Sequence, residues 1–149
     1  MPAIHFSPLT AVAVGTAGPP SLLSVSPHSS PSTAIAVTAG GVVKELDFQW
    51  VLLGLTVPGG TRIRGVVVCY QIVGGKSTYV SQVRLSEMTT PDTALVVHDD
   101  PTNLTSTVPV CYRSKVTGVT VNGTITLELK MVFGSKKDKI LVGGIALLN

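Results

Sequence analysis

The chain has 149 residues, and 44% of them are hydrophobic whereas only 13% are charged, about half the usual share of a soluble protein. One domain with a single core accounts for this length, and Gly, Pro and Thr interrupt every apolar run before it reaches the length of a membrane helix, about 18 residues. The net charge of +3 comes without a long basic run or interleaved aromatic residues, so the composition argues against a membrane-spanning or nucleic-acid-binding protein.

The first 43 residues contain no Lys, Arg, Asp or Glu, and prolines interrupt them repeatedly. They lack the positively charged start of a secretory signal peptide, so we do not expect a cleaved signal. Apolar residues such as Ile4, Phe6 and Val12 are scattered through them, which is unusual for a disordered leader. Two interpretations stay open: a disordered leader, or an ordered arm that contacts neighbouring subunits. In both, residues 1–43 precede a β-sandwich domain over residues 44–149.

Short alternating segments between Gly- and Pro-containing turns predict strands throughout the rest of the chain. In chain order these are residues 33–38, 46–52, 62–73, 78–85, 94–98, 108–112, 124–133 and 140–148. In the second of them the large residues, Trp50 included, are expected to face the core. In 78–85 we expect Tyr79 on the same face as Val83 and Leu85. The turn between 62–73 and 78–85 has hairpin-like spacing, and the last strand is expected to bend at Gly143-Gly144.

Residues 124–133 show the clearest pattern in the sequence. Apolar residues at every second position, Leu127 among them, alternate with polar ones such as Thr126, which predicts a long strand with one buried and one wet face. Asn122-Gly123 precedes it, and this dipeptide tolerates the positive φ angles of a type I′ turn. We therefore expect this strand to be the second arm of a hairpin.

Eight or so strands at intervals of roughly ten residues, without a convincing helix, predict an antiparallel β-sandwich with a jelly-roll or related Greek-key topology. An immunoglobulin-type sandwich is the competing fold. It is disfavoured because Trp50 precedes both cysteines, which is the wrong order for the Cys, Trp, Cys arrangement of that fold.

Three segments, residues 55–63, 68–70 and 140–145, resemble a module found in uncharacterised bacterial and phage proteins. In that module a leucine, proline, glycine, small, any, isoleucine turn leads into a long strand, and the last strand ends in a glycine-containing apolar run. The similarity covers residues 46–148. It implies a trimeric jelly-roll used in assembly or attachment, and it carries no catalytic residue across.

Catalytic motifs are missing from the sequence. There is no HExxH, CxxC pair, GxSxG or glycine-rich phosphate loop, and two of the three histidines lie in the first 43 residues. The one polar cluster is His98-Asp99-Asp100, whose acidic pair opens a predicted loop. Adjacent carboxylates before Pro101 more often start a turn than bind a metal or act as acid and base. We therefore expect no catalytic, cofactor or metal site, and not an enzyme.

Cys69 and Cys111 each lie between a valine and a tyrosine. If their strands are neighbours the two sulfurs can form a disulfide, which suits an extracellular or virion setting. Buried free cysteines that pack as small hydrophobic residues are the commoner explanation in a chain without a signal peptide.

Two functional classes fit these observations. The first is a non-enzymatic, self-associating subunit of a capsid, decoration, fibre or surface assembly, with a homotrimer expected because a monomer of this composition would expose large apolar patches. The alternative is a carbohydrate-binding or attachment module, because sandwiches often carry such sites on their loops.

Overall fold

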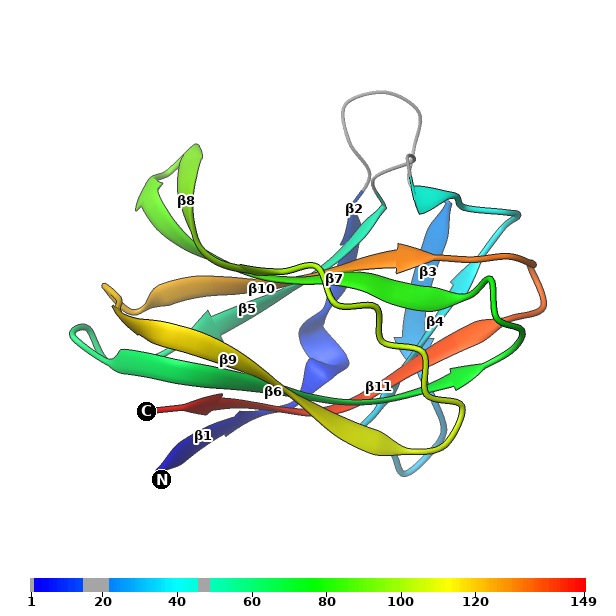
Figure 1. Cartoon of the computed structure of the whole chain (residues 1–149), viewed down its shortest axis with the longest axis horizontal. Coiled ribbons are helices and arrows are strands. Elements are labelled where there is room, and N and C mark those ends of the chain that lie inside the picture. Colours follow the sequence, from blue (N-terminus) through cyan, green and yellow to red (C-terminus); the bar gives the residue numbers. More distant parts are fainter. Residues whose placement is uncertain (1, 15–21, 46–48) are drawn as a thin grey trace.

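The computed structural model of the chain describes residues 2–14, 22–45 and 49–149, which form two antiparallel sheets (Figure 1). The first sheet has the spatial order β3 (Leu23–Pro27), β4 (Ile35–Ala39), β11 (Lys139–Leu148), β6 (Arg62–Val73), β9 (Val110–Thr120), and β1 (Ala3–Phe6) pairs with β11. The second has the order β2 (Val12–Val14), β5 (Trp50–Thr56), β10 (Thr124–Val132), β7 (Tyr79–Thr90), β8 (Thr93–Asp100). A short 3-10 helix, η1 (Pro8–Thr10), joins β1 to β2.

From β4 onward, every connection except that between β7 and β8 crosses from one sheet to the other. This order is that of a jelly roll, a sandwich in which strands distant in sequence become neighbours. The predicted fold class is therefore confirmed. No helix among the described residues is long and apolar enough to span a membrane.

The core lies between the two sheets and follows the alternation of β10. Leu127 has no exposed surface and pairs with Leu53 of β5 and Leu85 of β7, whereas Thr126 and Glu128 face outward. The predicted buried and wet faces are confirmed over residues 124–129, whereas Lys130, a polar residue of the same pattern, is only 8% exposed. The predicted hairpin is wrong, because β9 belongs to the first sheet and β10 to the second. The turn at Asn122-Gly123, with Gly123 at φ 110°, instead carries the chain between the sheets.

The connection between β6 and β7 likewise joins strands of different sheets, so the hairpin that its spacing suggested is not formed. The bend predicted in the last strand is confirmed. The register of β11 shifts between Val142 and Ile145, at Gly143-Gly144. Before this bulge β11 pairs with β4, and after it β11 pairs with β1 along the same edge.

The first 43 residues do not form a separate arm in the part that the structure describes. β1, β3 and β4 belong to the first sheet and β2 to the second, and Ile35, Val37 and Val43 are buried in the core. Residues 15–21, also part of the expected arm, lie outside the described residues. Because β1 to β4 are strands of the two sheets, the expected division at residue 44 does not match the strand pairing.

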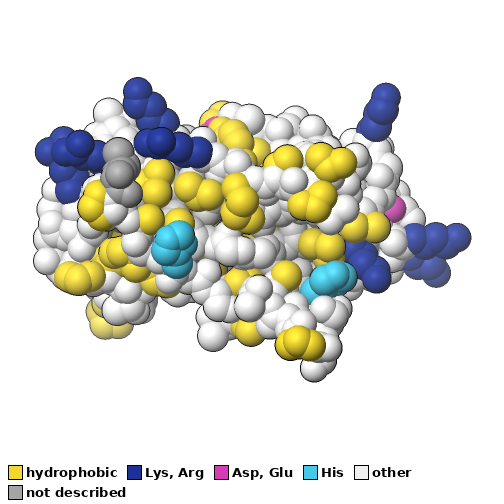
Figure 2. Space-filling view, turned by 90° about the horizontal axis from the view of Figure 1, so that it is seen from below, with side chains coloured by type: hydrophobic (Ala, Val, Ile, Leu, Met, Phe, Trp, Pro, Cys, Tyr) yellow, Lys and Arg dark blue, Asp and Glu magenta, His cyan; other side chains and the backbone are white. Residues whose placement is uncertain are grey.

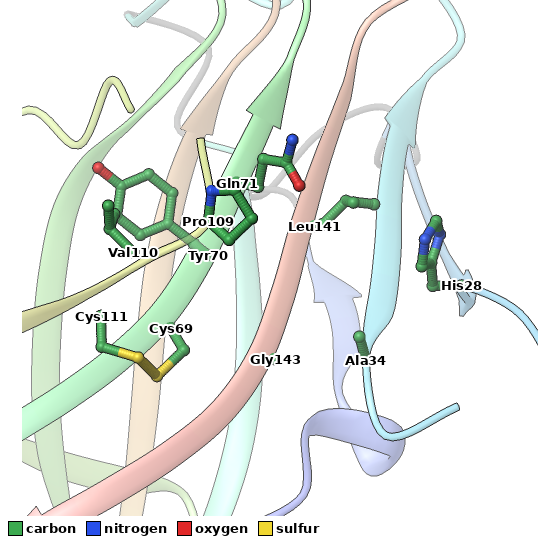
Figure 3. A pocket seen from close by; sticks show the side chains of 10 residues that line it. All are labelled: His28, Ala34, Cys69, Tyr70, Gln71, Pro109, Val110, Cys111, Leu141 and Gly143. Atoms are coloured by element: carbon green, nitrogen blue, oxygen red, sulfur yellow. A yellow bond between two sulfur atoms is a disulfide. The ribbon is translucent and has the colours of Figure 1, made fainter. Parts of the chain in front are cut away.

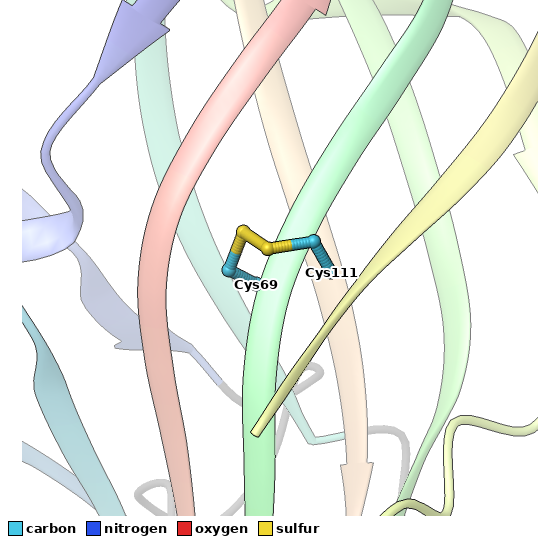
Figure 4. Close-up of a disulfide and its surroundings, with 2 residues drawn as sticks. All are labelled: Cys69 and Cys111. Carbon is cyan, nitrogen blue, oxygen red and sulfur yellow. A yellow bond between two sulfur atoms is a disulfide. The ribbon is translucent and has the colours of Figure 1, made fainter.

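Cys69 and Cys111 form a disulfide between the adjacent strands β6 and β9, where they are paired residues (Figure 4). Both side chains lie on the outer face of the first sheet, opposite the core. The alternative of two buried free cysteines is therefore wrong.

Candidate functional site

The outer face of the second sheet carries a row of aromatic and polar side chains that we call the aromatic-polar strip. Its members come from strands β5, β7, β8 and β10, and all point away from the core. They are Trp50, Tyr79, Gln82, Arg84, Asp99 and Glu128.

Trp50 lies on this outer face, and the prediction that it faces the core is wrong. The buried residues of β5 pair with the core residues of β10, and they are Val51, Leu53 and Leu55. Trp50 instead pairs with Lys130 and remains partly exposed. A shift of one residue moves every side chain of a strand to the other face, so the register of β5 against β10 decides where the chain's single tryptophan points.

Tyr79 also faces outward, although Val83 and Leu85 face the core. The cause is a bulge in β7: Gln82 pairs with Lys130 but Val80 pairs with Met131, which leaves Ser81 as an extra residue. A bulge reverses the alternation beyond it, so Tyr79 joins the face of Gln82. The predicted common face is therefore wrong.

Arg84 is the centre of the strip. Its guanidinium carbon lies 4.6 Å from the centre of the Trp50 ring, which places the cation over the aromatic face. Its Nε lies 3.5 Å from Oδ1 of Asp99, and its Nη1 lies 3.8 Å from Oε2 of Glu128. Gln82 donates a further hydrogen bond to Asp99. Arg84 is 27% exposed and Asp99 43%, so this network is both fixed in position and reachable from solvent.

A hollow of about 330 Å³ lies at the Tyr79 end of the strip. The Tyr79 hydroxyl donates a hydrogen bond of 3.1 Å to Glu45, and burial together with this carboxylate raises the pKa of Tyr79. Lys44 and Lys76 also line the hollow, and the buried Phe133 lies among its apolar lining. The strip and this hollow combine aromatic faces, carboxylates, an amide and cations on one side of the molecule.

A second hollow, about 480 Å³ in volume, lies on the outer face of the first sheet beside the disulfide (Figure 3). Leu141, Pro109 and the two cysteines make most of it apolar. Tyr70, its one tyrosine, is 7% exposed, and its hydroxyl accepts a hydrogen bond from the Ser106 amide. The ring of Tyr70 is therefore buried and His28 is the exposed ring of this hollow, whereas Trp50 and Tyr79 of the strip are both partly exposed.

In the cluster singled out in the sequence, His98 lies in a strand as predicted, whereas Asp99 and Asp100 lie in the same strand β8 and not in the predicted loop, and the three side chains separate. Asp99 joins the strip, whereas His98 and Asp100 both contact Ser114 of β9. The Ser114 hydroxyl donates a hydrogen bond of 2.6 Å to Oδ2 of Asp100. The same hydroxyl oxygen lies 2.7 Å from Nε2 of His98. Because the serine proton goes to the carboxylate, the imidazole donates to the serine.

This order differs from a catalytic triad, in which histidine accepts the proton of the serine. Ser114 is also fully buried, so no substrate can reach it. Burial lowers the pKa of His98, although Asp100 and Asp99 oppose this effect. The contacts join β8 of one sheet to β9 of the other, so this cluster closes an edge of the sandwich. Among the described residues, no group of three or more His, Cys, Asp or Glu could hold a metal ion.

Asp100 should make folding sensitive to acid. Burial alone would raise its pKa, but hydrogen bonds from Ser114, Thr102 and Tyr112 outweigh burial and hold the pKa at about 2, below the ordinary value of 3.8. The folded state thus favours the ionised carboxylate, and this stabilisation is lost as the pH falls from about 4 to about 2. Asp100 is partly exposed, and solvent screens its charge. Its ionisation therefore contributes about 1 kcal/mol at most to the free energy of unfolding.

Asp100→Asn should therefore lower the free energy of unfolding at pH 7 by about 1 kcal/mol and flatten its dependence on pH between 4 and 2. Urea unfolding measured across this range checks the expectation. Asp92→Asn, in the turn between β7 and β8, is the matched control. An unchanged pH dependence in Asp100→Asn would contradict the assignment.

Neither the protein-family models nor the curated proteins contain a match to this sequence. Solved structures do match the fold over nearly the whole chain. The carbohydrate-binding module CBM36 in complex with calcium and xylotriose has 15% identity and a TM-score of 0.54, over 99% of this chain and 100% of that one. CsCBM6-3 from Clostridium stercorarium in complex with cellobiose has 8% identity and a TM-score of 0.54, over 97% and 92%. TmCBM61 in complex with β-1,4-galactotriose has 12% identity and a TM-score of 0.54, over 94% and 88%. At these identities the similarity establishes the fold alone.

Proposed function

We propose that this protein is a non-catalytic carbohydrate-binding module whose sugar ligand lies on the aromatic-polar strip. The observation that carries the proposal is the Trp50, Arg84 and Asp99 arrangement. Sugar rings have apolar C–H faces that pack on aromatic rings, and hydroxyl groups that exchange hydrogen bonds with carboxylates, amides and guanidinium groups. The strip offers both kinds of contact, and Tyr79 offers a second ring at the edge of the neighbouring hollow.

The structural neighbours support the same class of ligand, since their complexes contain xylotriose, cellobiose and galactotriose. The jelly roll by itself does not decide the function, because capsid and lectin domains share it. The CBM36 complex also contains calcium. Among the described residues of this chain, no group of three or more His, Cys, Asp or Glu could hold such an ion.

Fluorescence of the single tryptophan gives a direct test. A glycan array of neutral oligosaccharides identifies a ligand, and titration of Trp50 fluorescence with that ligand measures its affinity. Arg84→Gln should weaken binding by about tenfold, the equivalent of about 1.4 kcal/mol, because it removes a hydrogen-bonding group held against the ring. Trp50→Ala, followed by calorimetry, should weaken binding at least as much.

Arg64→Gln is the matched control, because it removes an arginine from the opposite sheet. It should leave the affinity for the neutral ligand unchanged. Thermal unfolding verifies that each variant is folded. The proposal fails if no glycan binds, or if a ligand binds equally well to the wild type, Trp50→Ala and Arg84→Gln.

The self-associating subunit of a larger assembly is the second candidate function. One observation favours it: Met88, Leu95 and Val96 are exposed apolar residues on the hairpin of β7 and β8, which projects from the body of the sandwich (Figure 1). Light scattering on the samples used for titration separates the candidates. A mass near the 15.4 kDa of one chain favours the binding module, whereas a large closed oligomer without glycan affinity favours the assembly subunit.

A further inference from the structure

Four basic residues surround a hollow of about 400 Å³ on the outer face of the first sheet, remote from the aromatic-polar strip. They are Arg62 and Arg64 of β6 and Arg113 and Lys115 of β9, and we call them the basic hollow. In the view from the side of β1 and β11, Lys and Arg side chains lie at both ends of the molecule (Figure 2). Hydrophobic side chains occupy the middle of this face.

A bulge in β9 creates the hollow. Ile63 pairs with Val119 but Gly65 pairs with Lys115, so residues 116–118 of β9 lie opposite Arg64 alone. Such an insertion bends its strand and redirects side chains. The sheet therefore opens at the point where the four cations meet.

A glycine makes room for one of the guanidinium groups. Gly118 has φ +64°, and a Cβ atom added there would lie 2.7 Å from Nη2 of Arg62, closer than side chains approach. A side chain at position 118 would therefore have to displace the guanidinium of Arg62 from its present place.

No described acidic side chain neutralises this cluster. The two ion pairs that join one described residue to another both belong to Arg84, on the other sheet. Like charges held together repel one another, and a bound anion removes this repulsion. Guanidinium groups also bind carboxylate and sulfate oxygens through two parallel hydrogen bonds, which suits them to such groups.

We propose that the basic hollow binds an acidic glycan, a polysaccharide that carries carboxylate or sulfate groups. The described lining of the hollow contains no aromatic side chain, so bases of a single-stranded nucleic acid would find no ring on which to stack. The choice of a polysaccharide rests on the proposed function, whereas the preference for an anion rests on the four cations. The protein then has two glycan sites, one on each sheet, with different requirements.

Binding to dextran sulfate and to polygalacturonate, with uncharged dextran as the reference polymer, tests the proposal. The full chain should bind at least one of the two acidic polymers at low ionic strength, and binding should weaken as salt is added. The double variant Arg64→Gln, Arg113→Gln should lower that affinity at least tenfold. The two acidic polymers distinguish sulfate from carboxylate as the recognised group.

The control is the double variant Lys136→Gln, Lys137→Gln, which removes the same net charge from the turn before β11. It should retain the affinity. Equal loss in both double variants would overturn the proposal, because net charge alone would then explain binding. Absence of binding to both acidic polymers would overturn it, as would an equal affinity for a DNA oligonucleotide of similar charge. Neutral-glycan binding that depends on Trp50 must persist in Arg64→Gln, Arg113→Gln, so failure here is distinguishable from failure of the proposed function.

Discussion

Leu127→Asp is expected to yield no soluble folded protein. Leu127 is fully buried at the middle of β10, between Leu53 and Leu85. The substitution forfeits about 2 kcal/mol of apolar burial and places a carboxylate where it has no partner, which costs several kcal/mol more. Because domains of this size are stable by only about 5–15 kcal/mol, the sum removes most or all of the stability. The soluble fraction after expression and the far-ultraviolet circular dichroism spectrum measure the result.

Thr126→Asp is the matched control, because it adds the same carboxylate one residue away on the outward face of β10. There the charge stays in contact with water, so the free energy of unfolding should change by about 0.5 kcal/mol or less. Equal tolerance of the two substitutions would mean that the faces of β10 are reversed. If both substitutions abolished soluble folded protein, the strand would have to be covered on both faces.

Loss of the disulfide between Cys69 and Cys111 is expected to lower the free energy of unfolding by about 4 kcal/mol. The bond closes a loop with a sequence separation of 42, and such a closure restricts the unfolded chain by about this amount in the chain-entropy model. The folded sheet should persist at moderate temperature, because the ladder between β6 and β9 holds the same residues together. Urea unfolding with and without reductant gives the difference.

The double variant Cys69→Ser, Cys111→Ser separates loss of the bond from side effects of the reductant. It should unfold at the same urea concentration as the reduced wild type and should not respond to reductant. Thiol titration of the unfolded wild type should find no free thiol before reduction. Two titratable thiols would contradict the disulfide, and equal stability of oxidised and reduced protein would contradict its expected contribution.

The alternation of a strand is local, and so the sequence predicted what depends on it. The buried face of β10, the full extent of β6 and the bend at Gly143-Gly144 are all properties of a few consecutive residues. Together with the Gly and Pro turns, they were enough for the fold class. The absence of a recognised catalytic motif was equally readable from the chain.

The candidate site depended on contacts between distant residues. Trp50 was assigned to the core because large residues usually face inward, and Tyr79 was assigned by alternation to the face of Val83 and Leu85. The register of β5 against β10 and the bulge at Ser81 place both outside. One signal was available: Gln82 and Arg84 alternate with apolar residues in 78–85, which marks a polar face, although nothing local shows which aromatic residue meets them.

The same reason explains the other differences. The first 43 residues look like an arm because they are uncharged and prolines interrupt them, and only pairing with β5 and β11 shows that they complete the sandwich. Asn122-Gly123 specifies a turn, but the neighbours of β9 and β10 determine whether the turn joins paired strands or crosses between sheets. The sequence by itself determined the fold class and the strands with a clear alternation, such as β6 and β10, which follow from local periodicity. It missed the short strands β1, β2 and β3, and it predicted only the first part of β9, as residues 108–112. Only the tertiary structure decided the sheet order, the disulfide partner and the exposed faces, because these arise from pairing between residues far apart in the chain.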